Sequence, residues 1–194
     1  MEEDIKPGYT RVTEMLSPWN NFDGIPAEIL EAKRVLGTEV HELIRMFNEC
    51  IPVVVVSGKK APYFQSFLSW MLETKVSVRQ NEVRLYDDQL MITGQIDALV
   101  KFPEKDDLII LDWKTSASYN KKTGLSWALQ GVFYHYLLTQ NSTSNLSNTI
   151  MFVQLSSKGE MPKIREFEYS TELMRKGTAV LEAYRYFNPP TNEG

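Results

Sequence analysis

Two segments of the sequence place charged side chains inside otherwise apolar, strand-like runs. The run TGQIDALV carries Asp97, and the run LIILDWK carries Asp112 and Lys114. Side chains two residues apart in a strand lie on the same face, so Asp112 and Lys114 are expected to share one environment. A hairpin-like pairing of the two runs would bring the carboxylate of Asp97 beside that of Asp112.

Two neighbouring carboxylates repel each other unless a proton or a cation lies between them. Mg²⁺ or Mn²⁺ would relieve the repulsion, because these ions prefer oxygen ligands and keep several waters. Lys114 beside such an ion could position a water or stabilise the negative charge that develops during phosphodiester cleavage. The alternative is structural: Asp97 ends a strand, and Asp112 and Lys114 form an ordinary ion pair at a sheet edge.

Length and composition predict one globular domain over residues 1–194, since the chain is 43% hydrophobic and 24% charged. We expect a helical part over about 1–73 and a sheet with further helices over about 74–187. The longest apolar runs are too short to span a membrane, and MEEDIK at the start has no signal-peptide pattern. The expectation is an intracellular protein without a membrane partner, in the cytoplasm of a bacterium or of a phage- or virus-infected cell.

Cys50 is the one cysteine of the sequence. A single cysteine excludes an internal disulfide and a four-cysteine zinc or iron-sulfur site within this chain. Any metal is therefore expected to have oxygen and nitrogen ligands.

The net charge of −4 argues against a protein that coats nucleic acid non-specifically. A local basic groove stays open, and its candidates are three lysine pairs: Lys59 and Lys60, Lys101 and Lys105, and Lys121 and Lys122. Plain solvated surface is the alternative for each pair.

The apolar periodicity predicts helices and strands in a mixed order. Helices are expected over 26–49, 62–73, 124–140 and 171–187, and strands over 75–87, 90–101, 107–114, 149–156 and 163–169. This order indicates the α/β or α+β class, with a mixed central sheet flanked by helices.

Three motifs in this order, G-x-x-D (94–97), D-W-K-T (112–115) and Q-x-x-x-Y (130–134), resemble those of the PD-(D/E)xK nuclease superfamily. Within it they resemble the RecB-like and Cas4-like branch, and especially the mitochondrial genome maintenance exonuclease type. TRVTEML (10–16) is similar to the S-V-T-x-x-L stretch of that type, and GTEVH (37–41) to its helix-borne histidine motif. The resemblance spans about residues 10 to 185 and implies a restriction-endonuclease-like core.

The resemblance also implies roles for individual residues. His41, Asp97 and Asp112 would ligate the metal together with the backbone carbonyl of Trp113. Asp97, Asp112 and Lys114 would form the catalytic set. For His41 taken alone, an ordinary surface or core histidine is the alternative.

Further residues would lie around that centre. Gln130, Tyr134 and Thr115 would contact substrate, and the spacing of Gln130 and Tyr134 independently puts both on one helix face. Glu82 stands where an acidic residue often precedes the G-x-x-D strand. It could contact metal or substrate indirectly, or be a solvated strand residue.

Other candidates receive a structural interpretation. His135 is expected to be structural. Trp19, Trp70 and Trp127 could stack on bases, although large aromatic side chains commonly serve the core.

The leading hypothesis is a Mg²⁺- or Mn²⁺-dependent DNA nuclease, in particular an exonuclease that prefers single-stranded ends. It would act in DNA recombination or repair, with possible recombination or replication partner proteins and without the iron-sulfur cluster of some related enzymes. One alternative is a non-catalytic DNA-binding or assembly subunit. Another is a small-molecule metal hydrolase, for which no sequence feature indicates a pocket. The motifs alone do not separate DNA from RNA, or one cutting polarity from the other.

Overall fold

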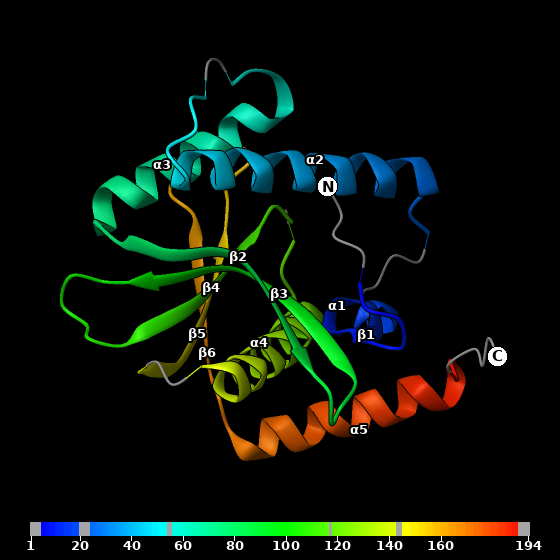
Figure 1. Ribbon diagram of the computed structural model, residues 1–194. Coiled ribbons are helices and arrows are strands. Elements are labelled where there is room, and N and C mark those ends of the chain that lie inside the picture. Colours follow the sequence, from blue (N-terminus) through cyan, green and yellow to red (C-terminus); the bar gives the residue numbers. More distant parts are fainter. Residues whose placement is uncertain (1–4, 20–23, 54–55, 117, 143–144, 190–194) are drawn as a thin grey trace.

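The computed structural model of the chain describes residues 5–19, 24–53, 56–116, 118–142 and 145–189. Figure 1 shows one central sheet with helices on both of its faces. In chain order the elements are β1 (Thr10–Arg11), α1 (Val12–Met15), the 3-10 helix η1 (Ser17–Trp19), α2 (Ala27–Asn48), the 3-10 helix η2 (Gly58–Lys60), α3 (Ala61–Thr74), β2 (Ser77–Asp87), β3 (Ile92–Lys101), β4 (Leu108–Lys114), α4 (Lys121–Asn141), β5 (Leu146–Gln154), β6 (Lys163–Glu168) and α5 (Thr171–Phe187).

The predicted fold class is confirmed. The six strands form a mixed sheet in the order β1-β3-β4-β5-β6, and β2 pairs with the other edge of β3. Neighbouring strands are antiparallel except for the parallel pairs β1–β3 and β4–β5. Helix α4 connects the parallel strands β4 and β5, as a crossover between parallel neighbours requires. Each helix and strand expected from the periodicity is present within a few residues of its expected bounds.

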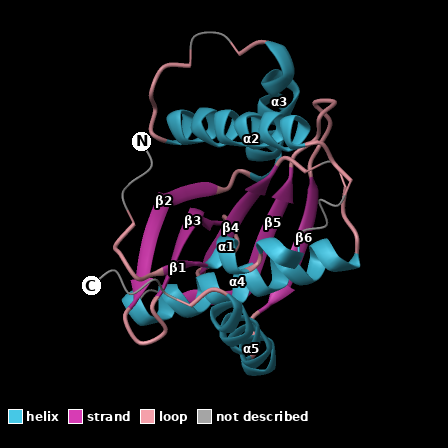
Figure 2. Cartoon of the chain, turned by 90° about the vertical axis from the view of Figure 1, so that its right-hand side faces the viewer, coloured by secondary structure: helices cyan, strands magenta, loops and turns pink. Residues whose placement is uncertain are grey.

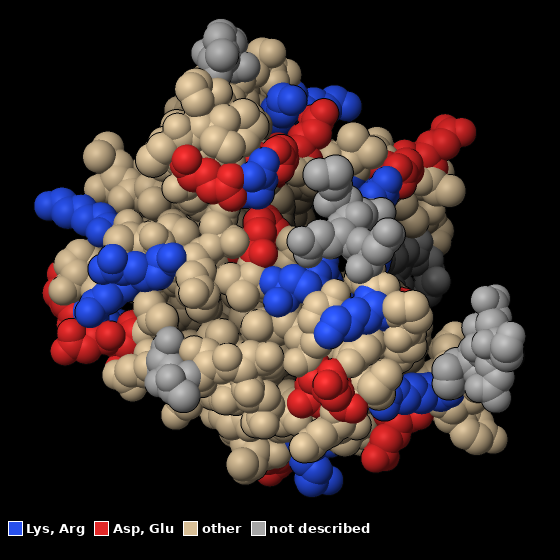
Figure 3. Space-filling view, viewed as in Figure 1, with Lys and Arg blue, Asp and Glu red and all other residues tan. Residues whose placement is uncertain are grey.

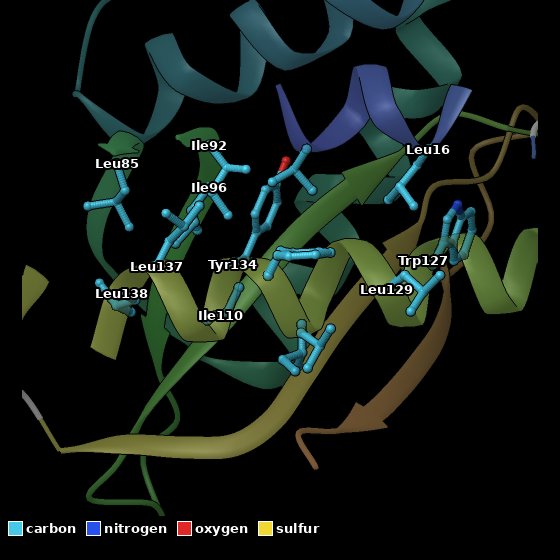
Figure 4. Packing of buried hydrophobic residues seen from close by; sticks show 14 of the residues in the cluster. Leu16, Leu85, Ile92, Ile96, Ile110, Trp127, Leu129, Tyr134, Leu137 and Leu138 are labelled. Carbon is cyan, nitrogen blue, oxygen red and sulfur yellow. The ribbon is translucent and has the colours of Figure 1, made fainter. Parts of the chain in front are cut away.

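The two faces of the sheet are covered by different helices. Figure 2 shows α2 and α3 on one side of the sheet and α4 and α5 on the other. Separate groups of buried apolar side chains fill the two sides, one around Phe67 and Trp113 and the other around Phe133 and Phe152. Figure 4 shows the second group between α4 and the sheet. Side chains of the strands therefore reach two distinct environments, depending on the face from which they project.

Helix α4 lies between the sheet and α5, and it is buried over most of its circumference. Its start is fixed by Asn120, whose side-chain oxygen accepts a hydrogen bond of 3.0 Å from the backbone N–H of Thr123. Gly94 of β3 allows the close contact, because a Cβ there would lie 2.8 Å from Tyr134 and 2.9 Å from Leu137. The glycine of the G-x-x-D motif thus sets how closely α4 approaches β3.

The edge of β3 that faces β4 is only partly paired. β1 pairs with Ile92 and Thr93 at one end of β3, and β4 pairs with 98–100 at the other. Residues 94–97 between them pair with neither β1 nor β4 in these strands. The sheet therefore opens at Asp97, the first predicted site residue.

Several other sequence expectations are decided by the fold. Trp70 and Trp127 are buried among core side chains, so the core interpretation holds for both. The side chain of Trp19 lies outside the described residues. In the described part of the chain, no helix is both long enough and apolar enough to cross a membrane.

Candidate active site

The site forms where β3 and β4 separate. Ala98 pairs with Leu111, so the next two positions along the hairpin are Asp97 and Asp112, as the sequence predicted. The strands part there, and an oxygen of Asp97 accepts a hydrogen bond of 2.8 Å from the backbone N–H of Trp113. The Asp97 carboxylate thus takes the place of a backbone acceptor at the divergence.

Helix α2 brings His41 to Asp97. Nδ1 of His41 lies 3.4 Å from Oδ1 of Asp97. The approach depends on Gly37, one turn earlier, where a Cβ would lie 3.3 Å from Oγ1 of Thr115 at the end of β4. The absence of a side chain at Gly37 thus lets this helix approach the sheet closely.

Asp112 and Lys114 project from β4 on the α4 side, and both contact Gln130. Nζ of Lys114 lies 2.6 Å from Oδ2 of Asp112 and 2.9 Å from the Gln130 side-chain oxygen. The amide nitrogen of Gln130 donates to Oδ1 of Asp112 at 2.8 Å and to the hydroxyl of Tyr134 at 2.9 Å. Asp112, Gln130 and Tyr134 are 2%, 6% and 3% exposed, so this network is sealed from solvent except at Lys114.

Glu82 of β2 is part of the site. One ligand atom each from His41, Glu82 and Asp97 can be chosen so that all three lie within 4.8 Å of one another. Asp112 is not in this compact group. Of the predicted metal ligands, the structure therefore brings His41 and Asp97 together with Glu82, and it places Asp112 in contact with Lys114 instead.

Burial and neighbouring charges shift the protonation of these groups. Burial raises the pKa of Asp112 to about 6, with Asp97 adding to the rise and Lys114 opposing it. Burial alone would raise the pKa of Asp97, but His41, Lys114 and the Trp113 N–H lower it below its usual value. Burial and Asp97 raise the pKa of Glu82.

The pKa of His41 is raised although the residue is buried. Burial lowers the pKa of a histidine, but the charge of Asp97 and the contact with it outweigh that effect and raise the pKa of His41 to about 9. Without a cation, His41 is therefore the positive partner of Asp97. A metal ion would replace that proton.

The donor set fits a hard divalent cation. Its carboxylate oxygens are the ligands that Mg²⁺ and Mn²⁺ prefer, the imidazole of His41 adds one nitrogen donor, and the described site contains no thiolate. Oδ2 of Asp112 is buried, and within the described residues it lies 2.6 Å from the ammonium group of Lys114. A cation would reach that oxygen by displacing the ammonium group, for which Gln130 offers another acceptor.

Two residues of the site were missed by the sequence analysis. The amide nitrogen of Gln95 donates to Glu82, and Arg84 donates to the amide oxygen of Gln95. A signal was available for Gln95, because it lies two residues before Asp97 in the same strand. Nothing in the sequence marked Arg84, since the pairing of β2 with β3 was not predicted.

The three residues predicted to contact substrate lie in different environments. Thr115 is half-buried at the end of β4, whereas the polar atoms of Gln130 and Tyr134 face Asp112 and Lys114. His135 is buried and stacks on Tyr169, with ring centroids 4.2 Å apart, away from the described site contacts.

Basic side chains on the face shown in Figure 3 lie in separate groups between acidic and uncharged residues. Two of the six candidate groove lysines are in ion pairs: Lys60 lies 3.6 Å from Glu39, and Lys101 lies 3.4 Å from Asp106. The basic groove stays a prediction.

The family model of the PD-(D/E)XK nuclease superfamily matches residues 30–185, which include His41, Glu82 and both aspartates. The chain belongs to this superfamily. Membership supports a nuclease, because the enzymes of this superfamily hydrolyse phosphodiester bonds with divalent metal ions, and it implies DNA as the substrate. It also favours a nuclease over the small-molecule metal hydrolase among the initial hypotheses.

Solved structures support the fold of this nuclease. SSO0001 has a TM-score of 0.56 at 12% identity, and the match covers 97% of this chain and 81% of that one. A "Putative exonuclease" from Eubacterium rectale has a TM-score of 0.50 at 14% identity, over 95% and 83% of the two chains. At these identities the likeness shows the fold alone. A comparison with curated proteins gives no match.

Proposed function

We propose that the chain is a Mg²⁺- or Mn²⁺-dependent deoxyribonuclease that shortens DNA from its ends and prefers single strands. The observation that carries the proposal is the meeting of His41 and Asp97 with the Asp112–Lys114 pair at the gap between β3 and β4. We further assign it to the RecB-like and Cas4-like branch, closest to the mitochondrial genome maintenance exonuclease type, because the ordered motifs from His41 to Tyr134 resemble that branch.

The cation would be held by His41, Asp97 and Asp112, with the backbone carbonyl of Trp113. When bound, it supplies positive charge to a phosphate oxygen and lowers the pKa of water. The protein fixes the donors beforehand: the Trp113 N–H holds one oxygen of Asp97, and Gln130 holds one oxygen of Asp112. The second oxygen of Asp97 lies 3.4 Å from His41, and the second oxygen of Asp112 would become available to the ion when Lys114 shifts to Gln130.

Lys114 would act on the reacting phosphate. Its ammonium group is oriented by Asp112 and by Gln130. The Lys114 side chain is also the partly exposed member of the network, at 20%. In this position it can hold the nucleophilic water and stabilise the charge that grows on the phosphate oxygens. Thr115, Gln130 and Tyr134 would support substrate or the groups that touch it.

The finer assignments are part of the same proposal. End-directed cutting of single strands rests on the branch resemblance, and the Eubacterium rectale neighbour carries an exonuclease name of its own. We propose one nuclease domain over residues 1–194 and an intracellular role in DNA recombination or repair, with recombination or replication proteins as possible partners. The sequence has one cysteine, too few for a four-cysteine iron-sulfur cluster.

A second candidate is a non-catalytic DNA-binding or assembly subunit that keeps the fold. One observation favours it: Asp112 is paired with Lys114 and lies outside the compact group of His41, Glu82 and Asp97. If that pair does not open, the cation lacks one of its expected ligands.

The test uses end-labelled single-stranded and duplex DNA of equal length with Mg²⁺, Mn²⁺ or EDTA. Wild type is compared with Lys114→Ala and Asp112→Ala, and Lys176→Ala serves as the matched control, because Lys176 pairs with Glu172 on the surface of α5. We expect metal-dependent shortening that is lost in both site variants and kept in the control. The label position then gives the polarity.

Other results would change the assignment. Internal cutting of circular DNA would replace the exonuclease with an endonuclease. A folded, metal-loaded protein that binds DNA and cuts none would favour the non-catalytic subunit.

A further inference from the structure

We propose that Glu82 is a further metal-ligating residue, and that Gln95 and Arg84 are positioning residues that aim its carboxylate. The inference rests on the proposed function in one respect, namely that a divalent cation binds at Asp97. It adds a ligand from β2, a strand that contributes none of the four donors named above.

The register of the sheet sets Glu82 directly against Asp97. The neighbours of Glu82 on β2 pair with the neighbours of Asp97 on β3: Asn81 with Ala98, and Val83 with Ile96. Residues that face each other in an antiparallel pair hold their side chains close together, and like charges in such a pair are destabilising. Two opposed carboxylates at a half-buried position repel each other unless a proton or a cation lies between or beside them.

The backbone at this pair departs from a regular strand. Ile96 packs on the α4 side of the sheet and Ala98 on the α2 side, although residues two apart normally share a face. The side chain of Asn81 contacts Asn48 of α2, whereas that of Val83 packs on the α4 side. The alternation thus reverses on both strands at the Glu82–Asp97 pair.

Glu82 itself has a φ of 54°, in the left-handed region that non-glycine residues adopt at a cost. With this conformation its carboxylate comes within 4.8 Å of ligand atoms of both His41 and Asp97. In the described part of the chain, no ion pair within 4.0 Å joins Glu82 to a basic side chain. The glutamate is therefore directed at His41 and Asp97 together, and no described basic side chain holds it in an ion pair within 4.0 Å.

Gln95 and Arg84 hold that orientation. They face each other across the same two strands, two pairs along from Glu82 and Asp97. Arg84 donates to the amide oxygen of Gln95, which leaves the amide nitrogen of Gln95 to donate to Glu82. One oxygen of Glu82 is thereby fixed and the other is free, which is how outer hydrogen bonds orient a metal-ligating carboxylate.

The order of the hydrogen bonds, from Arg84 to Gln95 to Glu82, indicates more than a role in the stability of the sheet. A role in stability alone would be met by a direct Arg84–Glu82 ion pair, which would cancel the charge of the glutamate. Placing a neutral amide between them keeps the carboxylate available to a cation. The charge of Arg84 instead fixes which end of the Gln95 amide faces Glu82.

The test measures Mn²⁺ binding directly, without DNA, by calorimetry and by the spectroscopic signal of free Mn²⁺. We expect Glu82→Gln, which keeps the shape and removes the charge, to raise the Kd at least 10-fold. Gln95→Ala should raise it about 10-fold, the lower end for an outer-sphere partner, and Arg84→Ala should act in the same direction. Glu104→Gln, on the exposed β3–β4 turn, is the matched control and should bind as wild type does.

Melting temperatures separate ligation from a structural role. In EDTA, Glu82→Gln should melt at or above the wild-type temperature because a repulsion has been removed, and added Mn²⁺ should stabilise it less than wild type. A structural glutamate would give a lower melting temperature in both conditions, and that result overturns the inference. Wild-type Mn²⁺ affinity in Glu82→Gln also overturns it.

The same binding measurements distinguish a failure of the role of Glu82 from a failure of the proposed function. If His41→Ala and Asp112→Ala weaken Mn²⁺ binding while Glu82→Gln does not, only the role of Glu82 is wrong. If the wild type binds neither Mn²⁺ nor Mg²⁺, the metal-dependent nuclease is wrong as well.

Discussion

Lys114 Nζ and Asp112 Oδ2 lie 2.6 Å apart, so the two residues expected to serve one reaction neutralise each other in the cation-free protein. A cation that takes Asp112 as a ligand must displace the ammonium group from that oxygen. Gln130 offers Lys114 an alternative acceptor at 2.9 Å. The pair can therefore open without leaving the lysine unpartnered.

This competition predicts opposite effects of two alanine variants on metal affinity. Lys114→Ala frees Asp112 and removes a nearby positive charge, so Mn²⁺ should bind as tightly as in wild type or more tightly, while cleavage falls about 10²–10³-fold. Asp112→Ala should lose both Mn²⁺ affinity and cleavage. Titration calorimetry and initial cleavage rates provide the two readings. Weaker Mn²⁺ binding in Lys114→Ala would show that the lysine supports the metal rather than competing with it.

Gln130 is expected to matter because it holds both members of the pair. Gln130→Ala removes the donor to the buried Oδ1 of Asp112 and one of the two acceptors of Lys114, which should lower the rate about 10–100-fold and cost about 1–3 kcal/mol of stability. Tyr134→Phe removes only the hydroxyl that accepts from Gln130, so its effect on the rate should be smaller. Cleavage rates and urea unfolding of the two variants test this order. A wild-type cleavage rate in Gln130→Ala would mean that Gln130 contributes to stability and not to the reaction.

Gly94 is predicted to be required for packing. A Cβ would lie 2.8 Å from a ring carbon of Tyr134 and 2.9 Å from a methyl group of Leu137. Gly94→Ala should therefore destabilise the fold by about 1–3 kcal/mol through overpacking. The same substitution in a Leu137→Ala background should cost less than it does alone, because one of the two contacts is gone. Additive losses in urea unfolding would mean that backbone effects, and not this contact, determine the cost.

Much of the site was predictable because its signals are periodic. A period of two places Asp112 and Lys114 on one face, and a spacing of four places Gln130 and Tyr134 on one helix face, and the structure has both arrangements. The motif order also marked His41, which reaches Asp97 although 56 positions separate them in the chain. The sequence therefore indicated the elements and most of the side chains.

The contribution of β2 could not be predicted in the same way. A strand pattern does not reveal its register, and a shift by one residue would turn every side chain to the other face. The pairing of Glu82 with Asp97 further depends on a left-handed glutamate, which no residue preference suggests. Glu82 could be noticed only as an acidic residue that precedes the G-x-x-D strand, and its partners Gln95 and Arg84 could not be connected to it.

The two histidines are predicted to respond to pH in opposite directions. The pKa of His41 is raised from 6.5 to about 9, so its contribution to stability is full below pH 6.5 and is lost as the pH rises through about 9. Burial lowers the pKa of His135, so its contribution is present above pH 6.5 and is lost as the pH falls through its lowered pKa. The chain has no other histidine.

Substitution should separate these two contributions in metal-free protein. His41→Gln should lose the most stability relative to wild type below pH 6.5, and the difference should shrink above pH 9. His135→Phe keeps a ring that can stack on Tyr169 and cannot be protonated, so it should resist acid better than wild type below pH 6.5. Free energies of unfolding by urea at pH 5, 7 and 9.5 in EDTA measure both differences. Equal differences at all three pH values would mean that neither histidine changes its protonation on folding, and the coupling of His41 to Asp97 would then have to be weaker than their 3.4 Å contact indicates.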